Sequence, residues 1–479
     1  MPRADARWSG WGGVLLVAVT YIYFLIFAQF AFLKRLATLG IADVHLKTVM
    51  AAMAIGGIAL SLLAPRLSLW SSPRLRLRVA LSACAASALV TLLPLGFAGS
   101  LIVSLLIGAS LGLLTVTVAT YLRSWLGNRN PLLKVGLGTG IGYLICNFPP
   151  LFNASAQLQA ITAAMFCLAG VFVSLKQAGP PAEETAAAPE STVSLLRVLT
   201  CFTALVWLDS AAFYIIQNTS ALKAGTWEST FNLWAIGLLH LLAALSSVWF
   251  LRRRSLPLLL SLAYVALAIA CLLLLTFGGI RLAFVFYPIG VSLYSVALVA
   301  YPSLLAPASS AAERGRKAGW VYAVAGWFGS AMGIGMSQQL GHVPPAFVLF
   351  SGAVILVPEL LGFLRRRKCE LAVAVAILVA ALCIQRASRV ASAGLPVAPA
   401  LRTCHDGLKH RHGETLSSRA FCFPGSRSYL AGIALAGVAD EAASNFKASA
   451  AAAADEAGFC PVTRFPSTCT KELQSAPFA

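Results

Sequence analysis

The acidic side chain that lies deepest in an apolar segment of this sequence is Asp209. It lies in the second half of an almost wholly apolar run over 198–216. At about 1.5 Å per residue, a helix of this length can cross a hydrocarbon core of ~30 Å. A carboxylate at that depth costs roughly 2.5–3.5 kcal/mol on insertion scales, so it should face protein or a water-filled cavity. We interpret Asp209 as a proton-coupling or cation-binding group. The alternative is an acid hydrogen-bonded to a neighbouring Ser or Tyr for packing.

A second titratable group, His240, lies in the middle of the next apolar run. Imidazole titrates close to neutral pH, which suits a proton relay, and it also binds transition metals. The alternative is a neutral histidine that is hydrogen-bonded to another helix. If Asp209 and His240 meet between the two segments, they form a protonatable pair, and the sequence alone does not decide whether they meet.

Two methionines, Met332 and Met336, are four residues apart, so a helix places their thioethers on one face. Soft sulfur ligands select Cu(I), which makes this pair a candidate metal site. The alternative is that both residues fill gaps in an ordinary core. The eleven cysteines are scattered and no CxxC occurs, so we expect neither a zinc site nor an intact c-type haem motif, and we predict no cofactor.

Uncharged polar side chains within the apolar runs could line a cavity. The alternative is hydrogen bonding between helices, worth about 0.6 kcal/mol each on average. The candidates are Gln29, Asn147, Gln217 and Asn218, together with Tyr21, Tyr143, Tyr214 and Tyr294.

The composition indicates the kind of protein in which these residues lie. The chain has 479 residues, of which 59% are hydrophobic and 11% are charged. A soluble domain carries about 25% charged residues, so this deficit indicates an integral membrane protein with many spans. The net charge of +19 does not suggest nucleic acid as a partner, because Arg and Lys cluster in short loops between apolar runs. The first run is too long for a cleavable signal peptide and is predicted to be a span.

Twelve apolar runs predict twelve membrane-spanning helices in an all-α chain. The first six are 11–32, 48–64, 79–97, 100–120, 131–150 and 157–175. The second six are 195–217, 231–251, 256–277, 281–304, 318–338 and 345–364. The clearest basic clusters follow even-numbered spans, which predicts that the N-terminus lies in the cytoplasm. We expect the protein in the inner cell membrane. We therefore predict an N-terminal bundle (1–175), a cytoplasmic linker (176–193) and a C-terminal bundle (194–368).

A faint internal repeat connects the two sets of spans, as expected of a duplicated transporter. Spans four and five carry Tyr121, Lys134, Gly136, Gly138, Gly140 and Gly142. Spans ten and eleven carry Tyr301, Lys317, Gly319, Gly326, Gly329 and Gly333.

Six spans, a polar linker and six more spans resemble the major facilitator superfamily over about residues 10–365. The stretch Arg314-Gly315-Arg316-Lys317-Ala318-Gly319 is similar to the family's loop into span eleven. Between spans two and three the family usually has Gly-x-x-x-Asp-Arg-x-Gly-Arg-Arg. The corresponding segment 57–66 keeps the basic Arg66 but lacks the acid. The family's usual gating salt bridge is therefore not supplied by this loop.

The resemblance implies two six-helix bundles around a central cavity and secondary transport of a small solute by alternating access. Asp209 would be the first coupling residue to test, in a proton-coupled mechanism. Copper importers of this superfamily carry a Met-x-x-x-Met pair, so copper uptake through Met332 and Met336 is a narrower form of the hypothesis. The expected partners are a small-molecule or ion substrate and membrane lipid, and we expect a monomer. No nucleophile–base pair or phosphate-binding loop occurs, so an enzyme is not predicted.

The C-terminal region raises a second hypothesis. The segment 369–385 is short for a thirteenth helix and would need local thinning of the bilayer to cross it, and 386–479 is predicted to be unstructured. Read one nucleotide over, codons for 400–403 can encode Tyr-Val-Arg. That sequence resembles a segment of mono-haem cytochrome subunits of haem–copper oxidases. The alternative function is then a membrane anchor or assembly factor that binds respiratory oxidase subunits and supplies copper, with a degraded or frameshifted cytochrome-like domain as its tail.

Overall fold

A computed structural model describes residues 10–41, 43–67, 72–176, 194–253, 255–276, 279–306 and 310–366. All of them belong to the first of two compact units, Met1–Leu382. The second unit, Cys383–Ala479, lies outside the described residues. Almost all of the predicted linker, the predicted thirteenth helix and the predicted tail also lie outside them.

The first half contains six long helical segments in the order that the sequence predicts. The first runs through α2 (Trp11–Ile22), the π-helix η1 (Tyr23–Ala31) and α3 (Phe32–Thr38). The next three are α4 (Asp43–Leu63), which ends in the short η2 (Ala64–Arg66), α5 (Pro73–Val90) and α6 (Phe97–Thr120). The short α7 (Leu122–Leu126) precedes α8 (Pro131–Cys146), and α9 (Pro149–Phe152) precedes α10 (Ala156–Lys176).

The second half repeats this order. It comprises α11 (Leu195–Asn218), the short α12 (Ser220–Thr226), α13 (Thr230–Arg252) and α14 (Leu256–Leu273). These are followed by α15 (Ile280–Ala300) with η4 (Tyr301–Leu305), by α16 (Ala311–Trp320), η5 (Val321–Phe328) and α17 (Gly329–Leu340), and by α18 (Pro345–Arg366). The described residues contain helices and no strand, which confirms the predicted all-α fold. Eight of these segments are long and apolar enough to cross a membrane.

The third segment differs from its predicted position. The sequence predicts a span over 79–97, whereas α5 begins at Pro73 and ends at Val90. Pro73 is in the first turn of α5. Proline has no backbone N–H, and in the first turn this costs nothing because an N–H there would have no partner within the helix. Arginines at every second position, Arg74, Arg76 and Arg78, make the start of this helix look like a loop in the sequence. In the structure they are helical, and Arg76 donates to the carbonyl oxygen of Leu67 at 3.1 Å.

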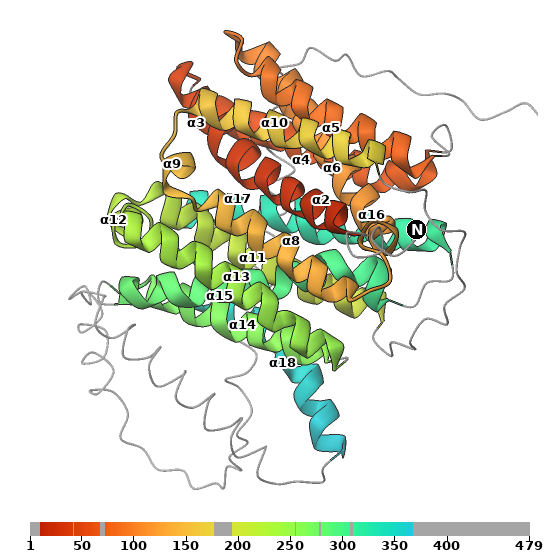
Figure 1. Cartoon of the computed structure of the whole chain (residues 1–479). Helices are drawn as coiled ribbons and strands as arrows, with labels where there is room; N and C mark the ends of the chain where they lie inside the picture. Colours follow the sequence, from red (N-terminus) through yellow and green to blue (C-terminus); the bar gives the residue numbers. More distant parts are fainter. Residues whose placement is uncertain are drawn as a thin grey trace, which may run out of the picture. The chain divides into compact units, whose positions relative to one another are not determined.

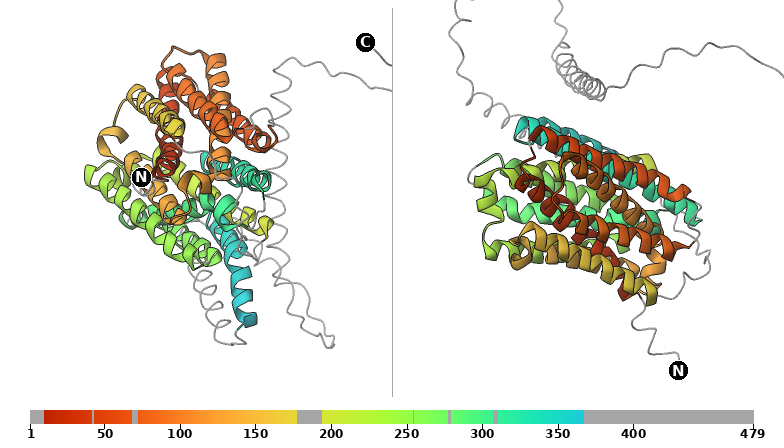
Figure 2. Two further views of the ribbon diagram at one scale, coloured as in Figure 1. Left: turned by 45° about the vertical axis from the view of Figure 1, so that its right-hand side comes forward. Right: turned by 90° about the horizontal axis from the view of Figure 1, so that it is seen from above.

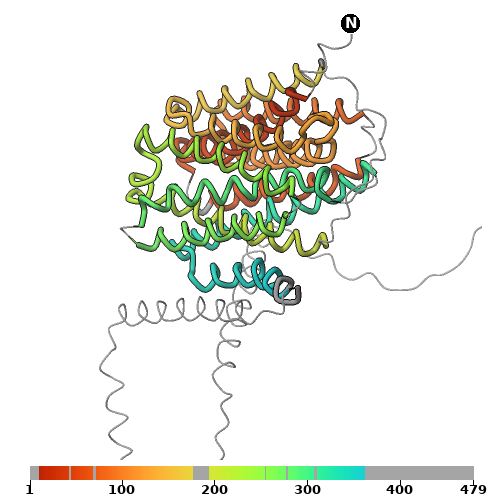
Figure 3. Tube along the Cα trace, turned by 60° about the horizontal axis from the view of Figure 1, so that its bottom comes forward, coloured from red at the N-terminus to blue at the C-terminus, as the bar shows by residue number. Residues whose placement is uncertain are grey.

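The long helices run side by side (Figure 1, Figure 2). Within the first half α4 packs along α6, α5 along α10 and α2 along α8. Within the second half α11 packs along α17, and α15 packs along both α13 and α14. Figure 3 shows the helices of the first half, red to gold, above those of the second half, green to blue.

Two of the packing contacts between the halves are related to each other. Helix α8 packs on α13, and α4 packs on η5 and α16. In the order of the long segments, α8 is the fifth of the first half and α13 is the second of the second half. Conversely, α4 is the second of the first half and η5 belongs to the fifth of the second half. A twofold exchange of the halves therefore maps one contact onto the other, as expected of a duplicated bundle.

Glycines allow the close approach in both halves. A Cβ at Gly136 would lie 2.8 Å from the carbonyl oxygen of Ala244, on the α8–α13 contact between the halves. A Cβ at Gly319 would lie 2.7 Å from the carbonyl oxygen of Ser61, on the equivalent contact of α16 with α4. Small residues at such positions let helix backbones pack closely in membranes. The glycine repeat of the sequence thus corresponds to equivalent helix contacts.

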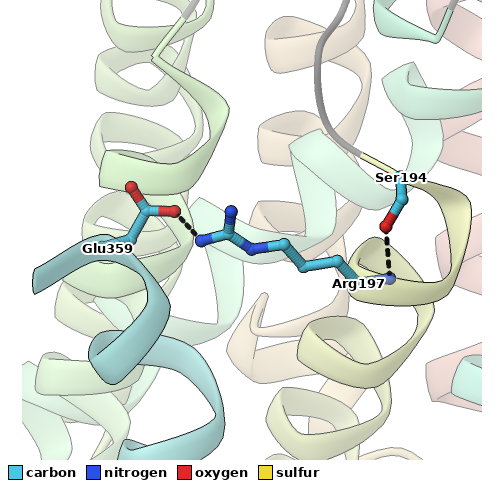
Figure 4. A network of polar contacts seen from close by, with 3 residues as sticks. All are labelled: Ser194, Arg197 and Glu359. Atoms are coloured by element: carbon cyan, nitrogen blue, oxygen red, sulfur yellow. Dashed lines mark hydrogen bonds and ion pairs between the residues drawn. The ribbon is translucent and has the colours of Figure 1, made fainter. Parts of the chain in front are cut away.

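The start of α11 is held by two polar contacts (Figure 4). The backbone N–H of Arg197 donates to the side-chain oxygen of Ser194 at 3.3 Å, which caps the helix. The guanidinium of Arg197 forms an ion pair with Glu359 of α18. These contacts hold the N-terminal end of α11, the helix that carries Asp209.

Candidate functional site

A cavity of about 190 Å³ is lined by residues of both halves. From the first half the lining comes from α2, η1, α6, α8 and α9. From the second half it comes mainly from α11, α13, α15, η5 and α17. Helices α8 and α13 and the segment η5, which pack across the two halves, all contribute lining residues, so a change in the packing between the halves would change the cavity.

Asp209 lines the cavity, and two tyrosines of α15 hold its carboxylate. The hydroxyl of Tyr287 donates to Oδ1 at 2.6 Å, and the hydroxyl of Tyr294 donates to Oδ2. Each carboxylate oxygen keeps lone-pair capacity for a further donor. The acid is therefore positioned within protein at the wall of a cavity.

His240 lies on α13 at the same cavity and is buried. Its Nδ1 is 2.8 Å from the hydroxyl oxygen of Ser292, and its ring stacks on Tyr143 with the centroids 4.1 Å apart. The hydroxyl of Tyr143 is in turn 3.1 Å from that of Ser295. Asp209 and His240 share the cavity, but among the described residues no hydrogen bond joins them directly.

The structure separates the uncharged candidates into two groups. Gln29 and Asn147 line the cavity, as do Tyr21, Tyr143 and Tyr294. Gln217 and Tyr214 on α11, and the exposed Asn218, are not among the lining residues. The amide of Asn218 donates to the carbonyl oxygen of Tyr214 at 2.8 Å. The role predicted for these three residues in a cavity therefore has no support from the geometry.

Met332 and Met336 lie on α17 and do not line the cavity. Both are half-buried, and Met336 packs against the hydrophobic core. Among the described residues there is no group of three or more His, Cys, Asp or Glu that could hold a metal ion. The copper site at the two methionines stays a prediction.

Two stretches of π-helix line the cavity, and no pattern in the sequence predicts them. In η1 the lining residues include Phe24 and Gln29, and in η5 they include Tyr322 and Trp327. At the end of η1 the backbone N–H of Phe32 bonds to the carbonyl oxygen of Phe27, five residues back. Such widened turns occur often at functional sites.

Four aromatic rings from both halves meet at one end of the cavity. Phe30 and Phe152 come from the first half, and Phe213 and Trp227 from the second. The ring centroid of Phe30 lies 5.4 Å from that of Phe213 and 6.3 Å from that of Trp227. We call these four residues the aromatic cluster. It lies near α9 and α12, at the end of the bundle on the left of Figure 1.

The opposite end, near α16, is joined by polar contacts between the halves. The hydroxyl of Ser303 donates to the carbonyl oxygens of Ala119 and Thr120. The Nε of Arg314 donates to the carbonyl oxygen of Thr120 at 3.2 Å. These carbonyls end α6, where the helix dipole attracts cations. We call this set of contacts the carbonyl clasp; its donors are side chains of the second half and its acceptors are main-chain oxygens of the first half.

No protein-family model matches this sequence, and no curated protein matches it. Solved structures do resemble it. The proton:xylose symporter XylE, of the major facilitator superfamily, bound to 6-bromo-6-deoxy-D-glucose, has a TM-score of 0.54 at 11% identity, and the match covers 76% of this chain and 96% of that chain. The human organic anion transporter MFSD10 (TETRAN) has a TM-score of 0.52 at 13% identity, covering 75% and 99%.

The chain has the major facilitator fold. The similarity to FucP, a transporter of the same superfamily in the outward conformation, has a TM-score of 0.49 at 14% identity, covering 72% of this chain and 97% of that chain. The fold confirms the predicted architecture of a polytopic membrane protein. At these identities the likeness concerns the fold alone, so the sugar and the organic anions belong to those proteins.

Proposed function

We propose that this protein moves a small solute across the membrane by alternating access through the central cavity. The observation that supports this most directly is a cavity between two halves, with a carboxylate in its wall and separate contacts between the halves at each end. Opening the aromatic cluster would expose the cavity on one side. Opening the carbonyl clasp would expose it on the other.

Asp209 is the proposed coupling residue, and His240 a second protonatable group of the same space. A carboxylate within a membrane bundle serves transport when it can exchange a proton or a cation with water or a ligand. Asp209 lies where a solute in the cavity would meet it, and its tyrosine partners hold it in place. Gln29 and Asn147 supply uncharged polar groups at the same wall.

The mechanism can be tested without knowing the solute. A cysteine at Ser330, which lines the cavity, is introduced into a chain whose native cysteines are replaced. Proteoliposomes are then treated with a membrane-impermeant thiol reagent from one side at a time. Alternating access predicts labelling from both sides. A Phe152→Cys/Trp227→Cys pair joined by a short thiol cross-linker should restrict labelling to the side of the carbonyl clasp.

Labelling from one side only, unchanged by the cross-link, would contradict alternating access. The matched control carries Phe152→Cys without Trp227→Cys and receives the same cross-linker, so that the aromatic cluster is not bridged while Ser330→Cys meets the reagent in the same way. Flux of a panel of labelled solutes, with and without a pH gradient, then identifies the cargo. Asp209→Asn is expected to remove the response of that flux to the gradient.

A further inference from the structure

The charged groups of the cavity are strongly unbalanced. Asp209 is the only acidic residue among those that line it, and within the described part of the chain no lysine or arginine lines it. The hydrogen-bond partners of the carboxylate are neutral tyrosine hydroxyls. Apart from the imidazole of His240, which pairs with Ser292, no basic side chain among the described lining residues stands opposite a negative charge at this position.

Aromatic rings form much of the remaining wall. They come from both halves and surround the space on several sides. The faces of such rings attract cations, and the attraction is stronger where water is excluded. The lining rings include Tyr21, Phe24 and Phe30 of the first half and Phe213, Tyr322 and Trp327 of the second.

The cavity is large enough for a small organic molecule. Its volume of about 190 Å³ exceeds the ~150 Å³ of an engineered apolar cavity that binds benzene, so it has room for a molecule such as choline or phenethylammonium. The few polar groups, among them Gln29 and Asn147, leave most of the wall apolar.

We infer that the cavity binds a small monovalent organic cation, with its charge beside Asp209 and its apolar body against the aromatic rings. This rests on the proposed function for how the ligand enters and leaves, but binding itself does not require transport. Each carboxylate oxygen accepts one tyrosine hydroxyl and keeps lone-pair capacity, so it can accept from an N–H of an ammonium group, or attract a quaternary one by its charge, while Tyr287 and Tyr294 stay bonded.

The test compares ligands that differ in charge and hardly in shape. Choline is paired with dimethylbutanol, its uncharged carbon isostere, and phenethylammonium with phenylethanol. Dimethylbutanoate supplies an anion. Binding to the purified full-length protein is followed by tryptophan fluorescence, because Trp227 and Trp327 line the cavity. We expect at least one cation to bind about tenfold or more tightly than its neutral partner.

Asp209→Asn keeps the size of the side chain and removes its charge. It should weaken binding of the cation about tenfold or more and leave binding of the neutral partner unchanged, which also shows that the variant is folded. Glu359→Gln removes an acid that does not line the cavity, and it should leave the preference for the cation intact.

Three results would overturn the inference: no binding of either cation, neutral or anionic partners binding as tightly as the cations, or unchanged cation binding in Asp209→Asn. The proposed function fails separately. Cation binding without access from both sides of the membrane would refute transport and keep the cation site. Access from both sides in a protein that binds neither cation would keep transport and refute the cation site.

Discussion

At the scale of single residues, the structure explains how His240 is held in an apolar helix. Its Nδ1 lies 2.8 Å from the hydroxyl oxygen of the buried Ser292, and its ring stacks on Tyr143. A buried polar group that loses its partner costs about 1–3 kcal/mol, whereas replacing both partners by apolar groups can be nearly neutral.

This pairing gives a direct prediction. His240→Phe keeps an aromatic ring for the stack but leaves the hydroxyl of Ser292 without its imidazole partner, so it should destabilise the protein by about 1–3 kcal/mol. Adding Ser292→Ala should recover most of that loss. Thermal unfolding of the single and double variants in detergent measures both effects. Equal destabilisation in the two variants would contradict the pairing.

The ion pair between Arg197 and Glu359 is expected to contribute little. The two side chains are 34% and 36% exposed, and exposed pairs of this kind are worth about 0.2–1 kcal/mol. A double-mutant cycle with Arg197→Ala and Glu359→Ala should give a coupling energy in that range, and 1 M salt should reduce it. A coupling energy of several kcal/mol would instead show a desolvated pair.

At the scale of helices, some glycines lie at close helix contacts and others face open space. On α17, a Cβ at Gly333 would lie 2.4 Å from the carbonyl oxygen of Trp207 on α11, whereas nothing lies within 4 Å of a Cβ at Gly335. The same substitution should therefore have opposite effects two residues apart on one helix.

We predict that Gly333→Ala destabilises the protein by about 1–3 kcal/mol, because the backbones of α11 and α17 must separate. Gly335→Ala should stabilise it by about 0.5–1 kcal/mol, because alanine lowers the entropy cost of the helix. The melting temperatures of the two variants and of the unchanged protein, measured in the same detergent, test both predictions. Destabilisation by both variants would mean that glycine matters here for flexibility rather than for contact.

The helices and part of the site could be predicted from the sequence, for identifiable reasons. Long apolar runs mark the twelve segments, and a lone acid within one of them marks Asp209. The start of α5 is missed because Arg74, Arg76 and Arg78 resemble a loop. The π-helices η1 and η5 leave no pattern in composition. Tyr287 and Trp227 are missed because ring residues are common in membrane helices, and only the packing brings these two to the cavity.

At the scale of the whole molecule, the orientation in the membrane stays a prediction from the basic loops. It assigns the end with α16 and the carbonyl clasp to the cytoplasm, and the end with α9, α12 and the aromatic cluster to the outside.

Exposed residues at the two ends test this assignment. Arg129 lies between α7 and α8, and Glu228 between α12 and α13, and both are exposed. In intact cells, an impermeant thiol reagent should label Glu228→Cys and should reach Arg129→Cys only after the membrane is opened. The reverse pattern would invert the orientation without changing the fold.

The carbonyl clasp has a consequence for acid tolerance. Its acceptors are the peptide oxygens of Ala119 and Thr120, and its donors are the Ser303 hydroxyl and the Arg314 guanidinium. Peptide oxygens take up no proton in water near neutrality, and arginine does not release one. A contact that used a carboxylate as its acceptor would weaken as the cytosol acidifies, because the carboxylate would take up a proton. Under the proposed mechanism and orientation, the carbonyl clasp therefore resists opening to the same extent in an acidified cytosol as at neutral pH.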